Sequence, residues 1–238
     1  MNRFIMWDFD YTLAYRNGMW TQTIMDLIVE ERISSIDESL ISPITKKGFP
    51  WHNATFSHQE LMNGLDWWTF LRMYFIKALI ELDLPVEKAT NIARRIKDKY
   101  LDINYWKAFD DTVEALDILS NKGYKHIILS NHVPELESLV KNLKLDVHFE
   151  EIISSGLVGY EKPHKMIFNY AISLLPENSD IIMVGDNYKA DIIGAIENDI
   201  PAILVRKPNR FNYSNYAENL DVSFINKVED IFGSGKND

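Results

Sequence analysis

Short apolar runs alternate with stretches of helical periodicity along most of this chain. The runs Phe4–Trp7, His126–Leu129, Ile181–Val184 and Ala202–Val205 have the length of a strand, and a weaker one surrounds Phe149–Ile153. Runs without alternating polar residues are typical of strands that helices cover on both faces. Strands separated by helices are joined by right-handed crossovers into a parallel sheet. The pattern therefore predicts an α/β fold, a Rossmann-like parallel sheet with helices on both faces.

The helices of this sheet can be placed between the strands. One is expected to begin at Asp110 or Asp111, and the others are expected through Leu136–Val140, Ile167–Ile172 and Ile192–Ile196. Beyond the last strand, the sequence predicts a basic surface turn at Arg206–Arg210, a helix at Asn226–Phe232 and a disordered end at Gly233–Asp238.

Residues 15–105 show a different pattern, with apolar residues at helical spacing and no convincing strand. Helices are expected to begin near four residues with capping or helix-starting character: Thr21, Ser57, Asp66 and Pro85. Between Thr21 and Ser57, the segment Ile36–Phe56 contains prolines and a glycine, which indicate a long connection between helices. A long connection in a compact domain is typical of a binding loop. We interpret the chain as a Rossmann-like core, 1–14 and 106–238, interrupted by an all-helical cap, 15–105, near the carboxyl ends of the strands.

Composition narrows the class of protein further. With 238 residues, 46% of them hydrophobic, the chain can form a soluble domain that accommodates a sizeable insertion. No apolar run is long enough to span a bilayer, and the first residues lack the pattern of a secretory signal, so no membrane partner is expected. The absence of cysteine excludes disulfides and thiolate metal sites and favours a cytoplasmic setting. A formal net charge of -10 disfavours nucleic acid as a partner, and the pattern leaves monomer and homodimer open.

Two carboxylates follow the first predicted strand. Asp8 and Asp10 are separated by one residue, so on an extended chain they point the same way and repel each other until a cation or a proton intervenes. In open α/β sheets ligands bind beyond the carboxyl ends of the strands, where these residues are expected. The alternative is a turn in which an Asp bonds its own backbone.

Other polar residues follow later strands or precede helices. Ser130 and Asn131 follow one strand, Asp186 follows another, and Lys162 lies just before a helix. Carboxylates without thiols form an oxygen-rich environment that suits magnesium rather than zinc. An Asp can act as a nucleophile, and a serine with a lysine can hold the oxygens of a transferring phosphoryl group. The sequence therefore predicts one site for phosphoryl chemistry.

Four segments in order resemble the motifs of the haloacid dehalogenase superfamily. They are Asp8-Phe9-Asp10-Tyr11-Thr12, Leu129-Ser130-Asn131, Glu161-Lys162-Pro163 and the run from Gly185 to Asp191. Each motif is short, but four in order at strand ends form a specific signal. The resemblance implies the fold described above, with a helical cap inserted after the first motif.

The resemblance also implies a role for each matching residue. Asp8 resembles the nucleophile and a metal ligand, while Asp10 resembles the general acid/base and binds metal through its backbone carbonyl. Thr12 resembles the residue that orients this loop, and it is also expected to bind substrate phosphate.

The remaining motif residues resemble ligands of phosphate and of the metal. Ser130, Asn131 and Lys162 match the phosphate-binding segments. Asp186 resembles a Mg2+ ligand, and Asp191 either a second ligand or a partner of Lys162.

Asp10 selects a reaction within the superfamily. A dehalogenase protonates no leaving alkoxide and lacks this second acid, so its presence favours phosphoryl transfer. We expect a magnesium-dependent phosphatase that hydrolyses a small phosphate monoester, such as a sugar phosphate, nucleotide or phosphoglycolate-like metabolite, through an aspartyl-phosphate. The alternatives are a phosphosugar mutase, which often has glycine in place of Thr12, and a non-catalytic member that binds a phosphorylated ligand or a protein.

Several cap residues are weaker candidates for substrate binding. His52 is proposed as a substrate contact, whereas Trp67 and Trp68 are expected to be structural because of their helical spacing. His132 is close enough in sequence to Ser130 to touch substrate or to begin the next helix. Arg16 is a candidate clamp for a second anionic group, although a solvated arginine is the commoner situation.

Overall fold

The structure is a computed structural model that describes residues 2–206 and the strand at 223–225. Its main sheet has six strands, all parallel, in the order β5-β4-β1-β6-β7-β8. The strands are β1 (Arg3–Trp7), β4 (Tyr124–Ser130), β5 (Phe149–Ser154), β6 (Asp180–Gly185), β7 (Ala202–Val205) and β8 (Ser223–Ile225). From the central strand β1 the chain builds the sheet first towards β5 and then, through β6, in the opposite direction. The crevice between β1 and β6 is therefore the switch point at which such sheets bind ligands.

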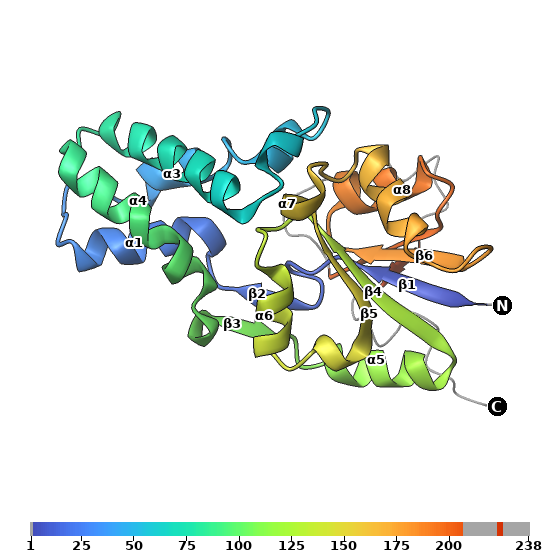
Figure 1. Cartoon of the computed structure of the whole chain (residues 1–238). Helices are drawn as coiled ribbons and strands as arrows, with labels where there is room; N and C mark the ends of the chain where they lie inside the picture. The colour runs from blue at the N-terminus through green and yellow to red at the C-terminus, as the bar shows by residue number, and fades with distance from the viewer. Residues whose placement is uncertain (1, 207–222, 226–238) are drawn as a thin grey trace.

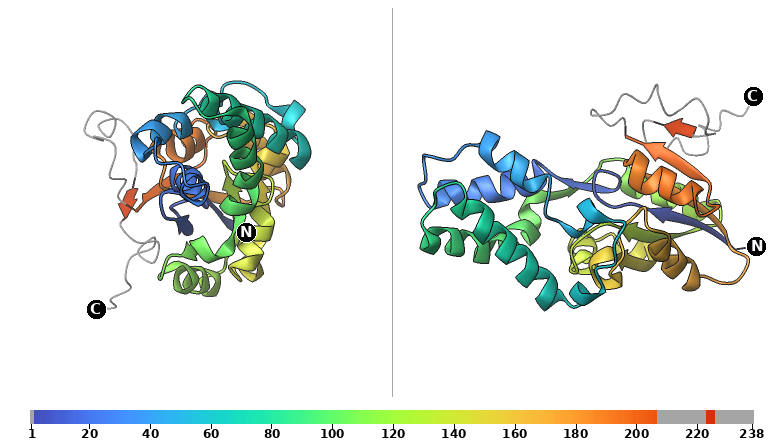
Figure 2. Two further views of the ribbon diagram at one scale, coloured as in Figure 1. Left: turned by 90° about the vertical axis from the view of Figure 1, so that its left-hand side faces the viewer. Right: turned by 90° about the horizontal axis from the view of Figure 1, so that it is seen from above.

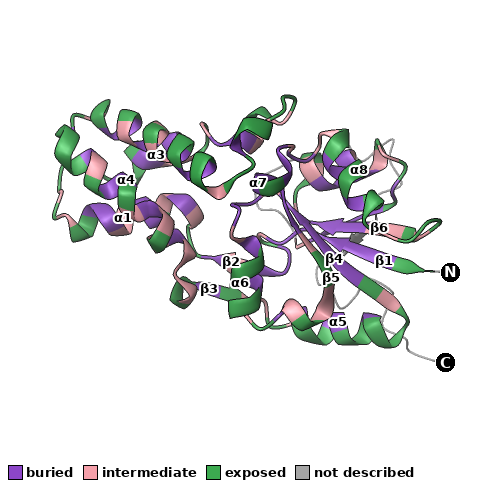
Figure 3. Ribbon diagram, viewed as in Figure 1, coloured by how far each residue is buried: buried purple, intermediate pink, exposed green. Residues whose placement is uncertain are grey.

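Helices cover both faces of this sheet, as predicted. Alternate residues of β1 enter different apolar clusters, because successive side chains of a strand point to opposite faces. Ile5 and Trp7 join the cluster that contains α5 (Thr112–Asn121) and α6 (Leu136–Asn142). Phe4 and Met6 join the cluster of α8 (Lys165–Ser173) and α9 (Gly194–Ile196). β1 and β4 are buried along most of their length (Figure 3), and the Rossmann-like α/β fold is confirmed.

A helical segment, which we define as residues 17–105, lies beyond the carboxyl ends of the strands (Figures 1 and 2). Its helices are α1 (Met19–Glu30), α2 (Glu38–Thr45), α3 (Gly64–Ile80) and α4 (Val86–Leu101). Its three short 3-10 turns are η1 (Pro50–Asn53), η2 (Gln59–Leu61) and η3 (Ile103–Tyr105). Among the described residues, no helix has both the length and the apolar character needed to cross a bilayer.

A two-stranded antiparallel ribbon joins the helical segment to the sheet. It consists of β2 (Ala14–Arg16) and β3 (Trp106–Ala108), which the sequence pattern did not indicate as strands. Three-residue strands are too short to show a periodicity, so only their pairing defines them. The predicted domain boundaries, 14/15 and 105/106, coincide with this ribbon, and the division into two domains remains a prediction.

Several predicted elements of the helical segment differ in the structure. α1 begins at Met19, so Thr21 lies inside the helix and does not begin it. The residue before the helix is Gly18, whose φ of 67° lies in the left-handed region that glycine adopts without a steric penalty. The capping pattern at Ser57 leads only to the 3-10 turn η2. The predicted connection Ile36–Phe56 contains α2 and η1, because burial of apolar side chains outweighs the helix-breaking character of Pro43.

The core also departs from prediction in places. The expected helix at Ile192–Ile196 begins as a π-helical turn, η5 (Tyr188–Ile193), before α9, and a short helix, α7 (Ser155–Val158), was not predicted. Arg206, the first residue of the predicted basic turn, is half-buried. Its guanidinium donates to the Thr12 carbonyl at 2.8 Å and pairs with Asp111 at 2.7 Å. The rest of that turn, the helix expected at Asn226–Phe232 and the end at Gly233–Asp238 lie outside the described residues.

Candidate active site

The first motif leaves the sheet in a tight turn. The Asp8 amide donates to the Val184 carbonyl at 2.9 Å and extends the pairing of β1 with β6 by one residue. The next amides turn back, since those of Thr12, Leu13 and Ala14 all donate to the Phe9 carbonyl. Tyr11 adopts a φ of 59° in this turn, a conformation that costs a residue with a side chain about 1 kcal/mol. The turn holds the Asp8 side chain at the crevice between β1 and β6, and the Asp10 side chain near His132, which follows β4.

The Asp8 carboxylate accepts hydrogen bonds from three different elements. Ser130 Oγ at the end of β4 and Lys162 Nζ in the loop before α8 each donate to Asp8 Oδ1 at 2.8 Å. Thr12 Oγ1 lies 3.5 Å from Asp8 Oδ2. The structure therefore brings three other predicted site residues to the carboxylate of Asp8, a residue that is only 6% exposed.

Lys162 is a buried cation between two carboxylates. Its Nζ lies 2.8 Å from Asp8 and 2.7 Å from Asp191, and it also donates to the Leu129 carbonyl at 2.6 Å. Burial would lower the pKa of this ammonium, but the charges of Asp191 and Asp8 raise it to about 12. The lysine thus stays charged across the physiological range, and it neutralises part of the repulsion in the site.

Asn131 supports Lys162 rather than the carboxylates. The Lys162 amide donates to Asn131 Oδ1 at 2.6 Å, and Asn131 Nδ2 donates to the Lys162 carbonyl at 2.8 Å. Both ends of the Asn131 amide are engaged by the backbone of this one residue. Its predicted contact with phosphate remains a prediction, whereas its observed contacts fix the lysine-bearing loop to the end of β4.

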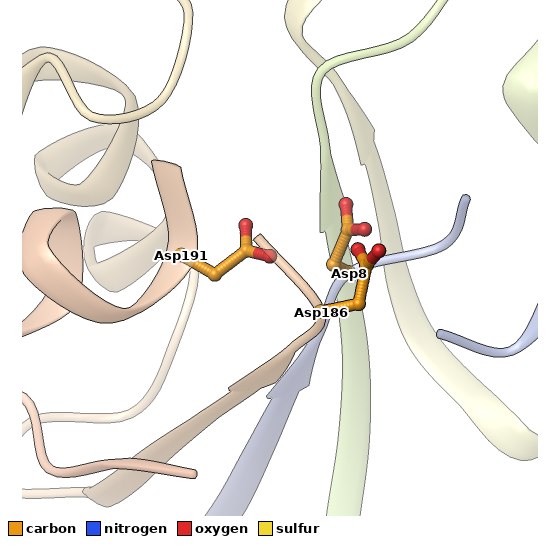
Figure 4. Close-up of side chains that lie close together, drawn as sticks. All are labelled: Asp8, Asp186 and Asp191. Carbon is orange, nitrogen blue, oxygen red and sulfur yellow. The ribbon is translucent and has the colours of Figure 1, made fainter. Parts of the chain in front are cut away.

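Asp8, Asp186 and Asp191 form a cluster that suits a metal ion (Figure 4). One carboxylate oxygen from each lies within 4.8 Å of the others, and burial followed by the charge of Asp8 raises the pKa of Asp186. Gly185 allows this close approach, because a Cβ there would lie 2.1 Å from Asp191 Oδ2. An all-oxygen donor set fits Mg2+ and not a softer metal. Asp191 already accepts from the Asn187 amide at 2.9 Å and contacts Lys162, so its oxygens have partners without a metal.

Asp10 lies beside His132, whose ring contacts Phe9, Tyr100 and Trp106. Its Oδ1 is fully covered and accepts no hydrogen bond, and His132 Nε2 lies 3.6 Å from it. Burial and then the charge of Asp8 raise the pKa of Asp10. Burial also lowers the pKa of His132 to about 4, so this histidine is neutral at neutral pH. His132 is thus buried beside Asp10 and does not begin a helix, since α6 starts at Leu136.

The cap candidates are placed differently. His52 lies on η1, where its Nδ1 accepts from the Phe49 amide at 3.3 Å and its ring contacts Phe49 and Trp51, so its role as a substrate contact stays a prediction. Trp67 and Trp68 are buried, which is the structural placement expected for them. Trp68 Nε1 donates to the carboxylate of Glu135, which precedes α6 in the core.

Three features of the site had no signal in the sequence. Arg16 is fully buried instead of solvated, and Tyr100 reaches from α4 to the surroundings of Asp10. Glu161, beside Lys162, is a buried carboxyl with an unpartnered Oε2. The apolar spacing of α4 predicted that Tyr100 is buried. It did not indicate whether this side chain packs within the helical segment or near Asp10. Whether a charged residue is buried can be learned only from the tertiary structure.

Glu161→Gln is expected to change how stability depends on pH. Burial raises the pKa of Glu161 to about 7, although a hydrogen bond with Ser155 and the charge of Lys162 oppose this rise. Between the ordinary pKa of a glutamate and pH 7, the folded protein therefore keeps a proton that the unfolded chain has released. This group therefore lowers the free energy of unfolding as pH rises from about 4.5 to about 7, by up to about 3 kcal/mol. Urea unfolding at pH 5 and pH 8 should show a smaller loss of stability in the variant than in the parent. The exposed Glu137→Gln is the control, and equal losses in all three proteins would contradict the assignment.

A Rossmann-like sheet that gathers acidic residues, a serine and a buried lysine at its switch point defines a class of hydrolytic α/β enzymes. The model of the haloacid dehalogenase-like hydrolases matches residues 3–199. The chain belongs to this family of hydrolases, as its four motifs predicted.

Three comparisons describe its relatives. Glyceraldehyde 3-phosphate phosphatase of Methanothermobacter thermautotrophicus is 32% identical over 132 residues, which cover 52% of this chain and 57% of that protein. Haloacid dehalogenase-like hydrolase domain-containing protein 3 of Xenopus laevis is 24% identical, over 81% of this chain and 80% of that one. The HAD-hydrolase YfnB of Bacillus subtilis, in a crystal structure bound to magnesium, shares the fold with a TM-score of 0.73 at 17% identity, covering 97% of each chain. The chain thus spans little more than half the length of the first relative and most of the other two.

Proposed function

We propose that this protein is a magnesium-dependent phosphatase that hydrolyses a small phosphate monoester through an aspartyl-phosphate on Asp8. The observation that carries the proposal is the Asp8 carboxylate, held at the switch point by Ser130 and Lys162, each at 2.8 Å. A carboxylate fixed in this way is oriented for attack, and its neighbours are the groups that stabilise a transferring phosphoryl group. The name of the 32% identical archaeal relative, a phosphatase of glyceraldehyde 3-phosphate, supports the same class of substrate.

One residue attacks the phosphorus atom, and two others stabilise the charge of the phosphoryl group. Asp8 attacks phosphorus and forms the acyl phosphate, while the ester oxygen leaves with the organic group. Lys162 Nζ and Ser130 Oγ, which donate to Asp8 in this structure, are positioned to donate also to the phosphoryl oxygens. Their donors offset the repulsion between the attacking carboxylate and the phosphate dianion.

Asp10 performs the two proton transfers. Its side chain follows Asp8 by one residue, and its fully covered Oδ1 has no hydrogen-bond partner in the protein. In the first step it gives a proton to the leaving alkoxide, and in the second it takes one from the water that attacks the aspartyl-phosphate. A dehalogenase has no use for this group, and a protein that only binds phosphate does not require it.

Mg2+ fits the acidic cluster and would neutralise charge between Asp8 and the phosphoryl group when bound. Asp8, Asp186 and the backbone carbonyl of Asp10 are the proposed ligands. The 2.7 Å contact between Asp191 and Lys162 supports a role for Asp191 as the partner of that lysine. The magnesium in the crystal structure of YfnB supports the choice of metal. A cytoplasmic metabolite is the proposed substrate, in accord with the absence of cysteine.

Magnesium is expected to stabilise the folded protein and to be required for turnover. Binding to the folded state alone raises the free energy of unfolding, by about 2.7 kcal/mol when the ion is at 100 times its dissociation constant. A thermal unfolding series with Mg2+, and with a chelator, should show this increase in the parent and lose it in Asp186→Asn. The exposed Asp180→Asn is the matched control.

Phosphate release from a panel of metabolite monoesters tests the activity itself. Release that needs Mg2+ and stops with chelator supports the phosphatase. A folded protein that gains stability from Mg2+ but releases no phosphate from any monoester would contradict it and favour a phosphosugar mutase or a binding protein.

A further inference from the structure

Arg206 joins three segments that lie far apart in the sequence. It directly follows β7, and its Nε donates to the Thr12 carbonyl, in the turn of the first motif, at 2.8 Å. Its Nη2 pairs at 2.7 Å with Asp111, which directly precedes α5. The guanidinium also lies over the ring of Phe109, 3.7 Å from the ring centroid. A planar guanidinium can make these contacts together, whereas the ammonium of a lysine is a single point charge.

These contacts lie at the base of the ribbon that joins the helical segment to the sheet. Thr12 comes just before β2, and Asp111 comes shortly after β3. The same two stretches of chain are also joined by their backbones, because the Phe109 amide donates to the Leu13 carbonyl at 3.1 Å. Arg206 therefore ties together the two points at which the chain leaves the core and returns to it.

The backbone on both sides of this contact is held in an unusual conformation. Arg206 adopts a φ of 52°, and Tyr11, beside Thr12, adopts a φ of 59°. Both values lie in the left-handed region, which is unfavourable for residues with a side chain, so surrounding contacts must hold the two segments in place. The side chains of Arg206 and Asp111 are 14% and 12% exposed, and a hydrogen bond between two charged groups is stronger than one between neutral groups. The pair is therefore suited to hold the turn.

The turn that Arg206 contacts is the one that carries the reactive carboxylates. Thr12 Oγ1 lies 3.5 Å from Asp8 Oδ2, and the Thr12 amide donates to the Phe9 carbonyl at 3.2 Å. A shift of the Thr12 backbone would therefore displace the first motif, which includes Asp8 and Asp10. The closer donors to the Asp8 carboxylate come from other elements, β4 and the loop before α8.

We propose that Arg206 is a positioning residue of the active site, which fixes the turn of the first motif by clamping the Thr12 carbonyl to Asp111. The inference rests on the proposed phosphatase function, because that function gives the turn a nucleophile to position. The clamp affects attack more than substrate binding, since the proposed phosphate donors, Ser130 and Lys162, belong to other elements. Displacement of a reacting group by about 1 Å can slow a reaction by about 100-fold.

Substitution of Arg206 is expected to lower kcat and to leave KM nearly unchanged. In Arg206→Met, kcat should fall about 10- to 100-fold while KM changes by less than about three-fold. Thermal unfolding checks that the variant is folded. Arg206→Lys, which keeps the charge but not the planar guanidinium, should show the same separation of kcat from KM and serves if Arg206→Met does not fold. Arg94→Met, at an exposed position of α4, is the matched control and should keep both parental values.

Hydrogen exchange tests the clamp without any turnover. The amides of Thr12, Leu13 and Ala14 donate to the Phe9 carbonyl, so their exchange rates report on the turn. In Arg206→Met these amides should exchange about ten-fold faster than in the parent, while the amides of β4 keep their rates.

The two measurements separate this inference from the proposed function. If the protein hydrolyses no monoester but Arg206→Met shows the faster exchange of the turn alone, the clamp stands and the phosphatase fails. If the protein hydrolyses monoesters and Arg206→Met keeps the parental kcat and exchange rates, the clamp is wrong and the phosphatase stands. An equal increase of exchange in the turn and in β4 would indicate general destabilisation and would also overturn the clamp.

Discussion

Asp8→Asn is expected to abolish turnover, with phosphate release falling by about a thousand-fold or more, as in other enzymes that lose their nucleophile. A neutral amide cannot attack phosphorus to form the aspartyl-phosphate. The fold should survive the change, because the amide oxygen can still accept from Ser130 and Lys162, which both donate to one oxygen of Asp8. Initial rates with saturating substrate and Mg2+ measure the effect. Thermal unfolding checks that the variant is folded.

The control for this substitution is Asp180→Asn, which makes the same chemical change at an exposed position at the start of β6. It should retain the parental rate. Mass spectrometry of the Asp8→Asn protein excludes residual activity from deamidation back to Asp. A clean, folded variant that turns over at the parental rate would remove Asp8 from the mechanism and the phosphatase proposal with it.

Lys162→Met is expected to damage both catalysis and stability. The change removes the cation between Asp8 and Asp191 while keeping most of the side-chain volume, so two buried carboxylates lose their partner. Breaking a buried pair in this way typically lowers the free energy of unfolding by about 3–5 kcal/mol. Loss of a donor to the phosphoryl oxygens should lower kcat/KM by about 100- to 1,000-fold. Urea unfolding without metal and steady-state kinetics with Mg2+ measure the two effects separately.

A second substitution tests the physical reason. Adding Asp191→Asn to Lys162→Met removes one of the unpaired charges, so it should restore part of the lost stability without restoring activity. Lys165→Met, at the exposed start of α8, is the control for loss of a lysine nearby. If the double variant is less stable than Lys162→Met by the full cost of Asp191→Asn alone, the two side chains are not coupled and the ion-pair account is wrong.

The motif residues were predictable because their positions depend on local sequence. The apolar runs at Phe4–Trp7 and Ile181–Val184 define strands β1 and β6, and the acids that follow them must emerge at the same edge of a parallel sheet. Ser130 follows β4 by the same logic, which is why the sequence alone assembles Asp8, Ser130 and Asp186 into one candidate site. The helices that cover the sheet follow from their apolar spacing, and α5 begins directly after Asp111, one of the two predicted starting residues.

The tertiary structure alone decides which polar groups are buried and what they face. Lys162 forms a buried ion pair, and the side chains of Glu161 and Arg16 are also buried. In the sequence, each of the three is an ordinary charged residue. Tyr100 comes beside Asp10 only because the helical segment folds back over the strand ends, through a ribbon too short to leave a periodic pattern. The sequence determines the sheet and its catalytic edge, since strand and helix signals are local. The packing of the helical segment on that edge depends on contacts between residues far apart in the chain, and it sets the surroundings of Asp10.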